Sequence, residues 1–164
     1  MSKIFNRIIL IIALTISLIT ICFAGDEQNA SNVIIFISFS MPKESIKGWL
    51  DEAAKIHAPV VIRGLVNNSF KETLKCMNTL MSDNKGGLQL DPTLFRQFQV
   101  SKVPAVVVRK SIQCSPNQSC MNDYDIVYGD VHLDYALQAV IRRNDTLSSI
   151  AKIELKRLRG GQNA

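Results

Sequence analysis

The chain has 164 residues, 47% of them hydrophobic, with 19 Lys and Arg against 14 Asp and Glu. Residues 25–141 carry eleven basic and twelve acidic side chains, whereas residues 142–164 carry six basic and two acidic ones. A nearly neutral body without a basic and aromatic stripe argues against direct binding of nucleic acid. The length suffices for one domain with a hydrophobic core, not for two.

The first 24 residues have the pattern of a secretory signal peptide. Lys3 and Arg7 precede an almost wholly apolar stretch over residues 8–21, and a small-x-small cleavage pattern ends at Ala24. We therefore expect export, cleavage near Ala24 and a short linker over residues 25–32. An uncleaved anchor is the alternative, but about 14 apolar residues fall short of the roughly 20 that a membrane-spanning helix needs.

Three cysteines remain after such a cleavage. Cys114 and Cys120 flank five residues of turn-forming types, a spacing that in an exported protein favours a disulfide closing a hairpin. The closed loop is short, so its entropic stabilisation is modest, on the order of 2 kcal/mol. Cys76 is left unpaired. Because His57 and His132 show no ligand spacing, we expect neither a metal site nor a cofactor.

The first elements in chain order predict a β-α-β unit. An apolar, β-branched run over residues 32–39 favours a strand covered on both faces. A helix then begins at Pro42, because the apolar residues after it recur with the spacing of one helix face, and Ser40 or Met41 is expected to cap it. A second apolar strand follows over residues 60–66, and strands joined through one helix pair in parallel with a right-handed crossover.

Residues 67–69 are expected to form a loop and a cap before a further helix. Its predicted buried face consists of Phe70, Leu74, Met77 and Met81. A short strand is then predicted over residues 88–90, and a brief helix from Asp91 to Phe98.

The last part of the domain is predicted to be a β-hairpin and a helix. A strand over residues 105–109 is expected to pair with residues 125–128 across the cysteine loop, and residues 133–141 form an amphipathic helix. We predict an α/β domain over residues 33–141 with a central mixed sheet flanked by helices. Beyond it, the basic tail of residues 142–164 is expected to form a marginal helix, capped by Asp145, that packs on the body; a partner-binding or membrane-surface segment is the alternative.

The predicted order of elements is that of a thioredoxin-like domain, but the redox motif of that fold is absent. Thioredoxins open the first helix with Cys-x-Pro-Cys, and alignment on Pro42 places Ser40, Met41 and Lys43 at the other three positions. A serine hydroxyl has a far higher pKa than a thiol, and no histidine lies near Ser40 in the sequence to act as a base. The pattern therefore indicates binding rather than turnover.

Four segments together resemble the F-type TrbC family of conjugative pilus assembly proteins. They are IFISFSMP at 35–42, PVVIRGLVNNSFKET at 59–73, DPTLFRQFQVSKVPAVVV at 91–108 and YGDVHLDYAL at 128–137. The resemblance implies a thioredoxin-like periplasmic protein of a Gram-negative type IV secretion system. It also implies that the protein acts with TraW-type assembly partners to build the conjugative pilus.

The same resemblance implies a groove beside Pro104. It implies that the Val103-Pro104 bond is cis and lies next to the start of the first helix. Ser40, Met41, Pro42, Val103 and Pro104 would then line a groove that holds an extended peptide by backbone pairing. The alternative is a trans proline that only opens the following strand.

The end of the second predicted strand adds two asparagines and an arginine. Asn67 and Asn68 would lie at the carboxyl end of a parallel strand, the edge at which α/β sheets bind ligands, although a turn and a cap explain them equally well. Arg63 interrupts an apolar strand, so it should either pair with Asp91 or Glu72 or reach solvent.

Two classes of function follow from these residues. The leading one is a non-catalytic assembly factor that holds an extended segment of another secretion-system protein. The alternative is a thiol-dependent chaperone or disulfide isomerase that uses Cys114 and Cys120, or Cys76 alone. A structural pilus subunit would need long hydrophobic helices, which residues 25–164 do not contain.

Overall fold

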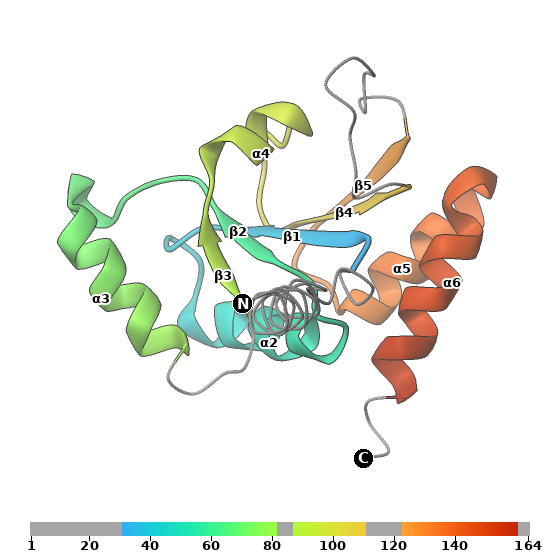
Figure 1. Cartoon of the computed structure of the whole chain (residues 1–164), viewed down its shortest axis with the longest axis horizontal. Coiled ribbons are helices and arrows are strands. Elements are labelled where there is room, and N and C mark those ends of the chain that lie inside the picture. Colours follow the sequence, from blue (N-terminus) through green and yellow to red (C-terminus); the bar gives the residue numbers. More distant parts are fainter. Residues whose placement is uncertain (1–30, 82–86, 111–122, 161–164) are drawn as a thin grey trace, which may run out of the picture.

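A five-stranded mixed sheet in the order β3-β2-β1-β4-β5 forms the centre of the protein (Figure 1). The computed structural model describes residues 31–81, 87–110 and 123–160. The central strand β1 runs parallel to β2 and antiparallel to β4, while β3 is parallel to β2 and β5 antiparallel to β4. The strands are β1 (Val33–Ile37), β2 (Val60–Ile62), β3 (Leu88–Leu90), β4 (Ala105–Arg109) and β5 (Tyr124–Tyr128). The predicted α/β class with a central mixed sheet is confirmed.

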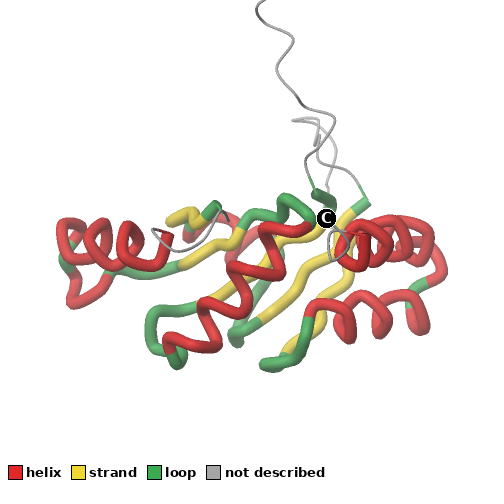
Figure 2. Tube along the Cα trace, turned by 90° about the horizontal axis from the view of Figure 1, so that it is seen from below, coloured by secondary structure: helices red, strands yellow, loops and turns green. Residues whose placement is uncertain are grey.

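Helices cover both faces of this sheet. They are α2 (Lys43–Lys55), the 3-10 turn η3 (Val66–Asn68), α3 (Phe70–Met81), α4 (Pro92–Gln97), α5 (Leu133–Arg143) and α6 (Asp145–Gly160). Figure 2 shows α2 lying across one face of the strands, with further helices at both ends of the sheet. The element order has the thioredoxin-like pattern expected from the sequence, with the short β3 and α4 added between α3 and β4.

The strand β1 is apolar throughout because both of its faces are buried. Val33, Ile35 and Ile37 belong to the larger core, which α2, α5 and α6 cover, whereas Ile34 and Phe36 belong to a smaller core closed by α4. The ring of Phe36 meets that of Phe95 of α4 edge to face, with 4.8 Å between the centroids. The predicted strand over residues 32–39 is thus confirmed, although its pairing stops at Ile37.

The prediction for β2 is wrong in its second half. The strand ends at Ile62 instead of continuing to Val66. Its neighbour β3 ends opposite Ile62 at Leu90; the Asp91 N–H still donates to the Ile62 carbonyl at 3.0 Å, and the chain then turns into α4, which the Asp91 carboxylate caps. With no strand left to pair with, residues 63–65 leave the sheet and lead into η3.

The predicted apolar face of α3 is confirmed in its second half and wrong in its first. Met77 is buried and Met81 packs partly buried against the larger core, but Phe70 is 60% exposed and Leu74 43% exposed, and the helix also buries Thr73 and Leu80. The Thr73 hydroxyl accepts the Val66 N–H at 2.9 Å and donates to the Ser69 carbonyl at 2.7 Å. These bonds turn Thr73 inward and rotate the apolar pair Phe70 and Leu74 out to solvent. Ser69 caps the helix as predicted, accepting the Glu72 N–H at 3.3 Å.

The segment beyond residue 141 continues α5 to Arg143 and then forms α6, which packs on α5, α2 and β4. Its inward residues are apolar apart from one glutamate; they are Leu147, Ala151, Glu154 and Leu158. The expected cap is wrong, because Asn144 Oδ1, not Asp145, accepts the Leu147 N–H at 3.1 Å. Two basic side chains of the expected tail pair with the body: Arg143 with Asp125 and Arg159 with Asp134, each at 2.7 Å.

The predicted hairpin and the short helix before it are confirmed. β4 covers residues 105–109 as predicted, β5 pairs with it from Tyr124, and Asp91 caps α4 by accepting the Thr93 N–H at 2.7 Å.

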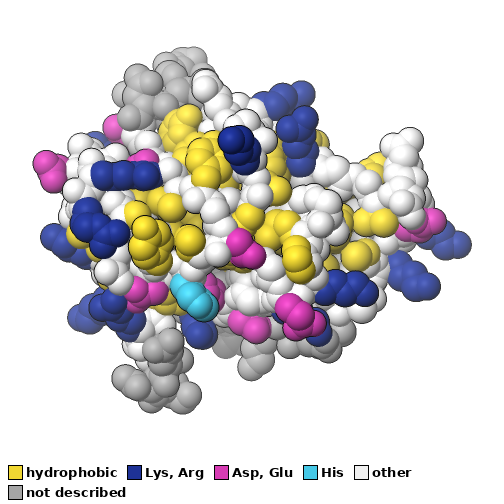
Figure 3. Space-filling view, turned by 180° about the vertical axis from the view of Figure 1, so that it is seen from behind, with side chains coloured by type: hydrophobic (Ala, Val, Ile, Leu, Met, Phe, Trp, Pro, Cys, Tyr) yellow, Lys and Arg dark blue, Asp and Glu magenta, His cyan; other side chains and the backbone are white. Residues whose placement is uncertain are grey.

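Cys114 and Cys120 lie outside the described residues, as does the expected signal peptide. Within the described ranges, no helix is both long and apolar enough to cross a membrane. Figure 3 shows apolar side chains gathered over the middle of one face, with most Lys and Arg side chains nearer its border.

Candidate partner-binding site

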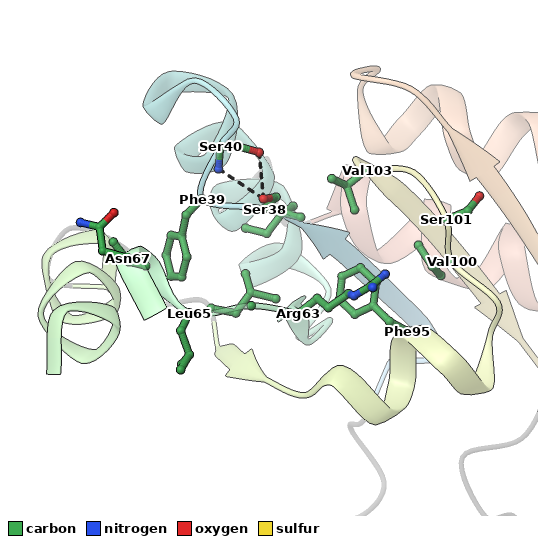
Figure 4. Close-up of a pocket in the computed structure, with 14 residues that line it drawn as sticks. Ser38, Phe39, Ser40, Arg63, Leu65, Asn67, Phe95, Val100, Ser101 and Val103 are labelled. Atoms are coloured by element: carbon green, nitrogen blue, oxygen red, sulfur yellow. Dashed lines mark hydrogen bonds between the residues drawn. The ribbon is translucent and has the colours of Figure 1, made fainter. Parts of the chain in front are cut away.

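A pocket of about 500 Å³ opens at the carboxyl ends of β1 and β2 (Figure 4). The carboxyl edge of parallel strands is the usual ligand-binding edge of an α/β sheet. Its walls come from the loop before α2, the chain from β2 to η3, α4 and the loop before β4. The lining residues are Ile37, Ser38, Phe39, Ser40, Ile62, Arg63, Gly64, Leu65, Val66, Asn67, Phe95, Val100, Ser101 and Val103.

The pocket brings together three of the seven residues predicted to bind a partner: Ser40, Asn67 and Val103. The other four lie next to it but do not line it. Met41 packs on the larger core, Pro42 and Asn68 are exposed, and Pro104 is buried. The loop before α2 and the loop before β4 therefore line one pocket, as expected. The residues that line it are Ser40 and Val103, which immediately precede Met41 and Pro104.

Ser40 does not cap α2, and neither does Met41, so this prediction is wrong. The N-cap position is occupied by Pro42, and no side chain accepts a hydrogen bond from the first turn. The hydroxyl of Ser40 lies 2.9 Å from that of Ser38, which also accepts the Ser40 N–H at 3.3 Å. Figure 4 shows this pair at the pocket wall below the start of α2. The two serines hold the loop in place and offer hydroxyls to the pocket.

The Val103-Pro104 bond is cis, as the resemblance implies. The Pro104 carbonyl accepts the Gly129 N–H at 3.0 Å, which ties the loop to the end of β5. Within the described residues, the N–H and C=O of Val103 make no hydrogen bond. Val103 also lines the pocket. Its backbone donor and acceptor are thus groups of the kind that pair with an added strand.

Asn67 and Asn68 both have left-handed backbone conformations, with φ of 49° and 54°. Asparagine tolerates this conformation better than most residues, so the pair shapes the turn between β2 and α3. The side-chain amide of Asn67 donates to Glu72 Oε2 at 2.8 Å. Asn67 thus lines the pocket while holding α3 to the turn, whereas Asn68 shapes the turn, is exposed and does not line the pocket.

Arg63 is exposed and lines the pocket, so of the two expected alternatives the one in which it reaches solvent is confirmed, and it pairs with neither Asp91 nor Glu72. The Asp91 carboxylate caps α4, accepting from Thr93 N–H at 2.7 Å and Leu94 N–H at 3.3 Å. The Glu72 carboxylate accepts from Asn67. Over residues 31–81, 87–110 and 123–160, no carboxylate pairs with Arg63.

A second polar cluster joins α2 to the start of α5, away from this pocket. Asp130 accepts from the Trp49 indole N–H at 3.0 Å and from the Ser45 hydroxyl at 2.9 Å. Glu52 accepts the Leu133 N–H at 2.6 Å and lies 2.8 Å from His132 Nδ1. The hydrogen bond and charge of Glu52 raise the pKa of His132 above its ordinary value. Glu52 therefore caps α5 from another helix and anchors it to α2.

The one cysteine among the described residues is not at a helix start. Cys76 is free and half-buried in the middle of α3, where it packs against the larger core. Cys114 and Cys120 fall in the part of the chain that is not described, and their disulfide stays a prediction. Among the described residues, no group of three or more His, Cys, Asp or Glu side chains could hold a metal ion.

Sequence reasoning missed the apolar wall of the pocket. Phe39, Leu65 and Phe95 each look like core residues in the sequence, yet they converge on one opening from three separate elements. One residue could have indicated the pocket from the sequence. Gly64 follows a buried strand, and a glycine there can mark a site where a ligand or another backbone approaches closely. A Cβ added to Gly64 meets nothing within 4 Å, so the pocket is open at that point.

Comparisons with known proteins point in one direction. Residues 35–140 match the family model TrbC_Ftype, described as the type-F conjugative transfer system pilin assembly protein. The chain is also 35% identical over 121 residues to a curated relative, the periplasmic protein TrbC of Escherichia coli, an alignment that covers 73% of this chain and 52% of that relative. The chain therefore spans about half the length of this relative. No solved structure matches.

Proposed function

Because this chain belongs to the family of type-F conjugative transfer system pilin assembly proteins, we propose that it is a non-catalytic periplasmic assembly factor for the conjugative pilus. It binds an extended segment of another component of the transfer system in the pocket between Ser40 and Val103. The periplasmic location agrees with the name of the relative from Escherichia coli and with the signal peptide expected in residues 1–24. TraW-type assembly proteins are the first partners to test.

The observation that carries this proposal is the free backbone of Val103. Its N–H and C=O have no partner in the described chain, and they lie at the rim of a pocket with apolar walls. An added strand would satisfy both groups, and its side chains would enter the pocket. Backbone pairing needs no thiol, which agrees with the serine in place of the first redox cysteine and with the position of Cys76 in the core.

The pocket can be blocked at Gly64 without disturbing the core. Gly64 lines the pocket, a Cβ there meets nothing within 4 Å, and its φ is not in the left-handed region. We expect Gly64→Trp to fold normally and to fill the space that a partner segment needs. Gly48, on the exposed side of α2, is a matched control, because its Cβ also meets nothing within 4 Å and it does not line the pocket.

The test is plasmid transfer from donor cells that lack this protein and carry one variant. We expect Gly64→Trp to reduce transfer to the level of cells without the protein, and Gly48→Trp to support wild-type transfer. Both proteins should accumulate equally in the periplasm and show wild-type circular dichroism. Full transfer with a folded, exported Gly64→Trp protein would show that the pocket is not the working surface.

A further inference from the structure

The pocket contains an unpaired cation. Arg63 is the one charged side chain among the described residues that line it, and its exposed guanidinium makes no ion pair with the described chain. Figure 4 shows the side chain running along the pocket between Leu65 and Phe95. A solvated arginine on an open surface would be unremarkable, but this one lies among apolar pocket walls at the ligand-binding edge of the sheet.

The two carboxylates expected to pair with Arg63 have other hydrogen-bond partners. Asp91 follows β3, whose pairing with β2 brings the Asp91 N–H to 3.0 Å from the Ile62 carbonyl, next to Arg63 in the chain. Its carboxylate is nevertheless bound to two N–H groups of α4, and the carboxylate of Glu72 is bound to Asn67. Both carboxylates thus have other hydrogen-bond partners, and the Arg63 guanidinium forms an ion pair with neither of them.

The other polar groups of the pocket also suit an anion. Ser38 and Ser40 place hydroxyl donors at its wall. The N-terminus of α2 begins at Lys43, shortly after Ser40, and no side chain accepts a hydrogen bond from its first turn, although Glu44 lies in that turn. The charge of the pocket lining therefore comes from Arg63, and the two serines add neutral hydrogen-bond donors beside it.

We propose that the partner segment bound in this pocket carries an acidic side chain that pairs with Arg63, with apolar residues on the same side of the segment against Phe39 and Leu65. An extended segment places every second side chain on one side, so the acidic and apolar residues would be two positions apart. Arginine can hold a carboxylate through two parallel hydrogen bonds, which fixes the register of the segment. This inference rests on the proposed function and adds the chemistry of the ligand to it.

The test is selection of peptides on the purified protein from two displayed libraries. One library presents random ten-residue segments flanked on both sides by constant linkers, so that carboxylates come only from side chains. The second presents the same segments with a free C-terminus. Wild type, Arg63→Glu, Arg63→Lys and Gly64→Trp are compared, and selected peptides are synthesised to measure their affinities.

We expect the linker-flanked library to yield peptides with Asp or Glu at one fixed position beside apolar residues. Arg63→Glu should weaken these peptides at least about tenfold, because a hydrogen-bonded charge pair is replaced by repulsion, and should itself select Lys or Arg at that position. Arg63→Lys should keep the acidic preference with lower affinity, since an ammonium lacks the two-pronged geometry.

The remaining outcomes separate this inference from the proposed function. Two results would overturn the role of Arg63 and leave the pocket as a binding site. In the first, the selected peptides do not bind Gly64→Trp but show no preference for Asp or Glu. In the second, Arg63→Glu binds the selected peptides as tightly as wild type does. Enrichment only from the free C-terminus library would replace the acidic side chain with a terminal carboxylate. Peptides that bind wild type and Gly64→Trp equally would overturn both proposals.

Discussion

An amphipathic helix lies at each end of the sheet, and the two helices differ in how far their apolar residues are buried (Figure 1). At the β5 end, α6 lies on α5 and buries Leu147 and Leu158 to 1% and 4% exposure. At the β3 end, α3 packs mainly on η3 and leaves Phe70 and Leu74 largely exposed. Helical spacing of apolar residues predicted both helices. It could not predict which apolar residues are buried, because burial depends on a neighbouring element that covers them.

The two ends of the sheet also differ in their roles: the β5 end stabilises the fold, and the other end carries the pocket that we propose binds a partner. The β5 end holds the ion pairs of Arg143 and Arg159 and the anchored start of α5, and it also buries two polar atoms that have no hydrogen-bond partner among the described residues, Arg109 Nε and Glu154 Oε2. The pocket lies toward the other end, where β2 stops early and Leu65 and Asn67 lead into α3. Regions with fewer buried contacts open at lower free-energy cost and can adjust to a partner. The end with fewer buried contacts is thus the one at which we propose that a partner binds.

The largest expected difference is between two leucines on the two helices. Leu147→Ala should lower the free energy of unfolding by about 2–5 kcal/mol, because it leaves a cavity in the core. Leu74→Ala should change it by less than about 1 kcal/mol, since Leu74 is 43% exposed. Urea unfolding followed by the fluorescence of Trp49, the one tryptophan of the chain, measures both. Equal losses would show that α3 is packed as firmly as α6.

A smaller difference is expected between the helix caps. Asn144→Ala removes the acceptor for the Leu147 N–H and should cost about 1 kcal/mol of global stability. Ser69→Ala removes the cap of α3, and we expect α3 to open locally while the rest of the domain keeps its stability. Amide hydrogen exchange distinguishes the two results: protection should fall across the domain for Asn144→Ala, and only in α3 for Ser69→Ala. Global loss in both variants would contradict the comparison.

The smallest effect on stability is a pH dependence at the start of α5. Glu52 raises the pKa of His132 in the folded protein, so this interaction stabilises fully below the unfolded pKa. The stabilisation is lost as the pH rises through the higher folded pKa, above about 6.5. Unfolding in urea at pH 5 to 9 should show this decline in wild type and lose it in His132→Ala. A decline of the same size in that variant would assign it to other groups.

No effect on transfer is expected from removal of the thiols. A protein with Cys76, Cys114 and Cys120 all changed to serine should support plasmid transfer whenever it folds and is exported, because the proposed binding uses backbone and pocket. Circular dichroism and the periplasmic amount of the protein are the controls. Loss of transfer by a folded, exported variant would favour the thiol-dependent chaperone or isomerase, and Cys76→Ser alone would then show which sulfur matters.

The sequence predicts most of the sheet because buried strands carry a strong local signal. The strand Ala105–Arg109 begins with four consecutive apolar residues, and its observed bounds match the prediction. The errors at β2 and at the face of α3 share a physical cause, because each depends on a pairing limit or a hydrogen bond outside the predicted element, such as the bond from Val66 to Thr73. The caps of α2 and α6 differ from the prediction locally: Pro42 occupies the N-cap position of α2, and Asn144 rather than its neighbour Asp145 caps α6.

The candidate site could be predicted only in part for the same reason. Ser40 and Val103 were identifiable because a family pattern places the helix start beside the proline. The apolar wall and the unpaired state of Arg63 arise from the convergence of four separate segments and from the engagement of Asp91 and Glu72 elsewhere. No single stretch of sequence carries that information.

The most direct test of the pocket is photocrosslinking in cells that are assembling pili. A photoreactive amino acid replaces Ser101, which lines the pocket, or Ser149, which is exposed on α6 at the other end of the sheet. We predict that position 101 crosslinks to one component of the transfer system, identified by mass spectrometry, and that Gly64→Trp abolishes this product. Absence of a crosslink from position 101, or the same product from position 149, would contradict binding in the pocket.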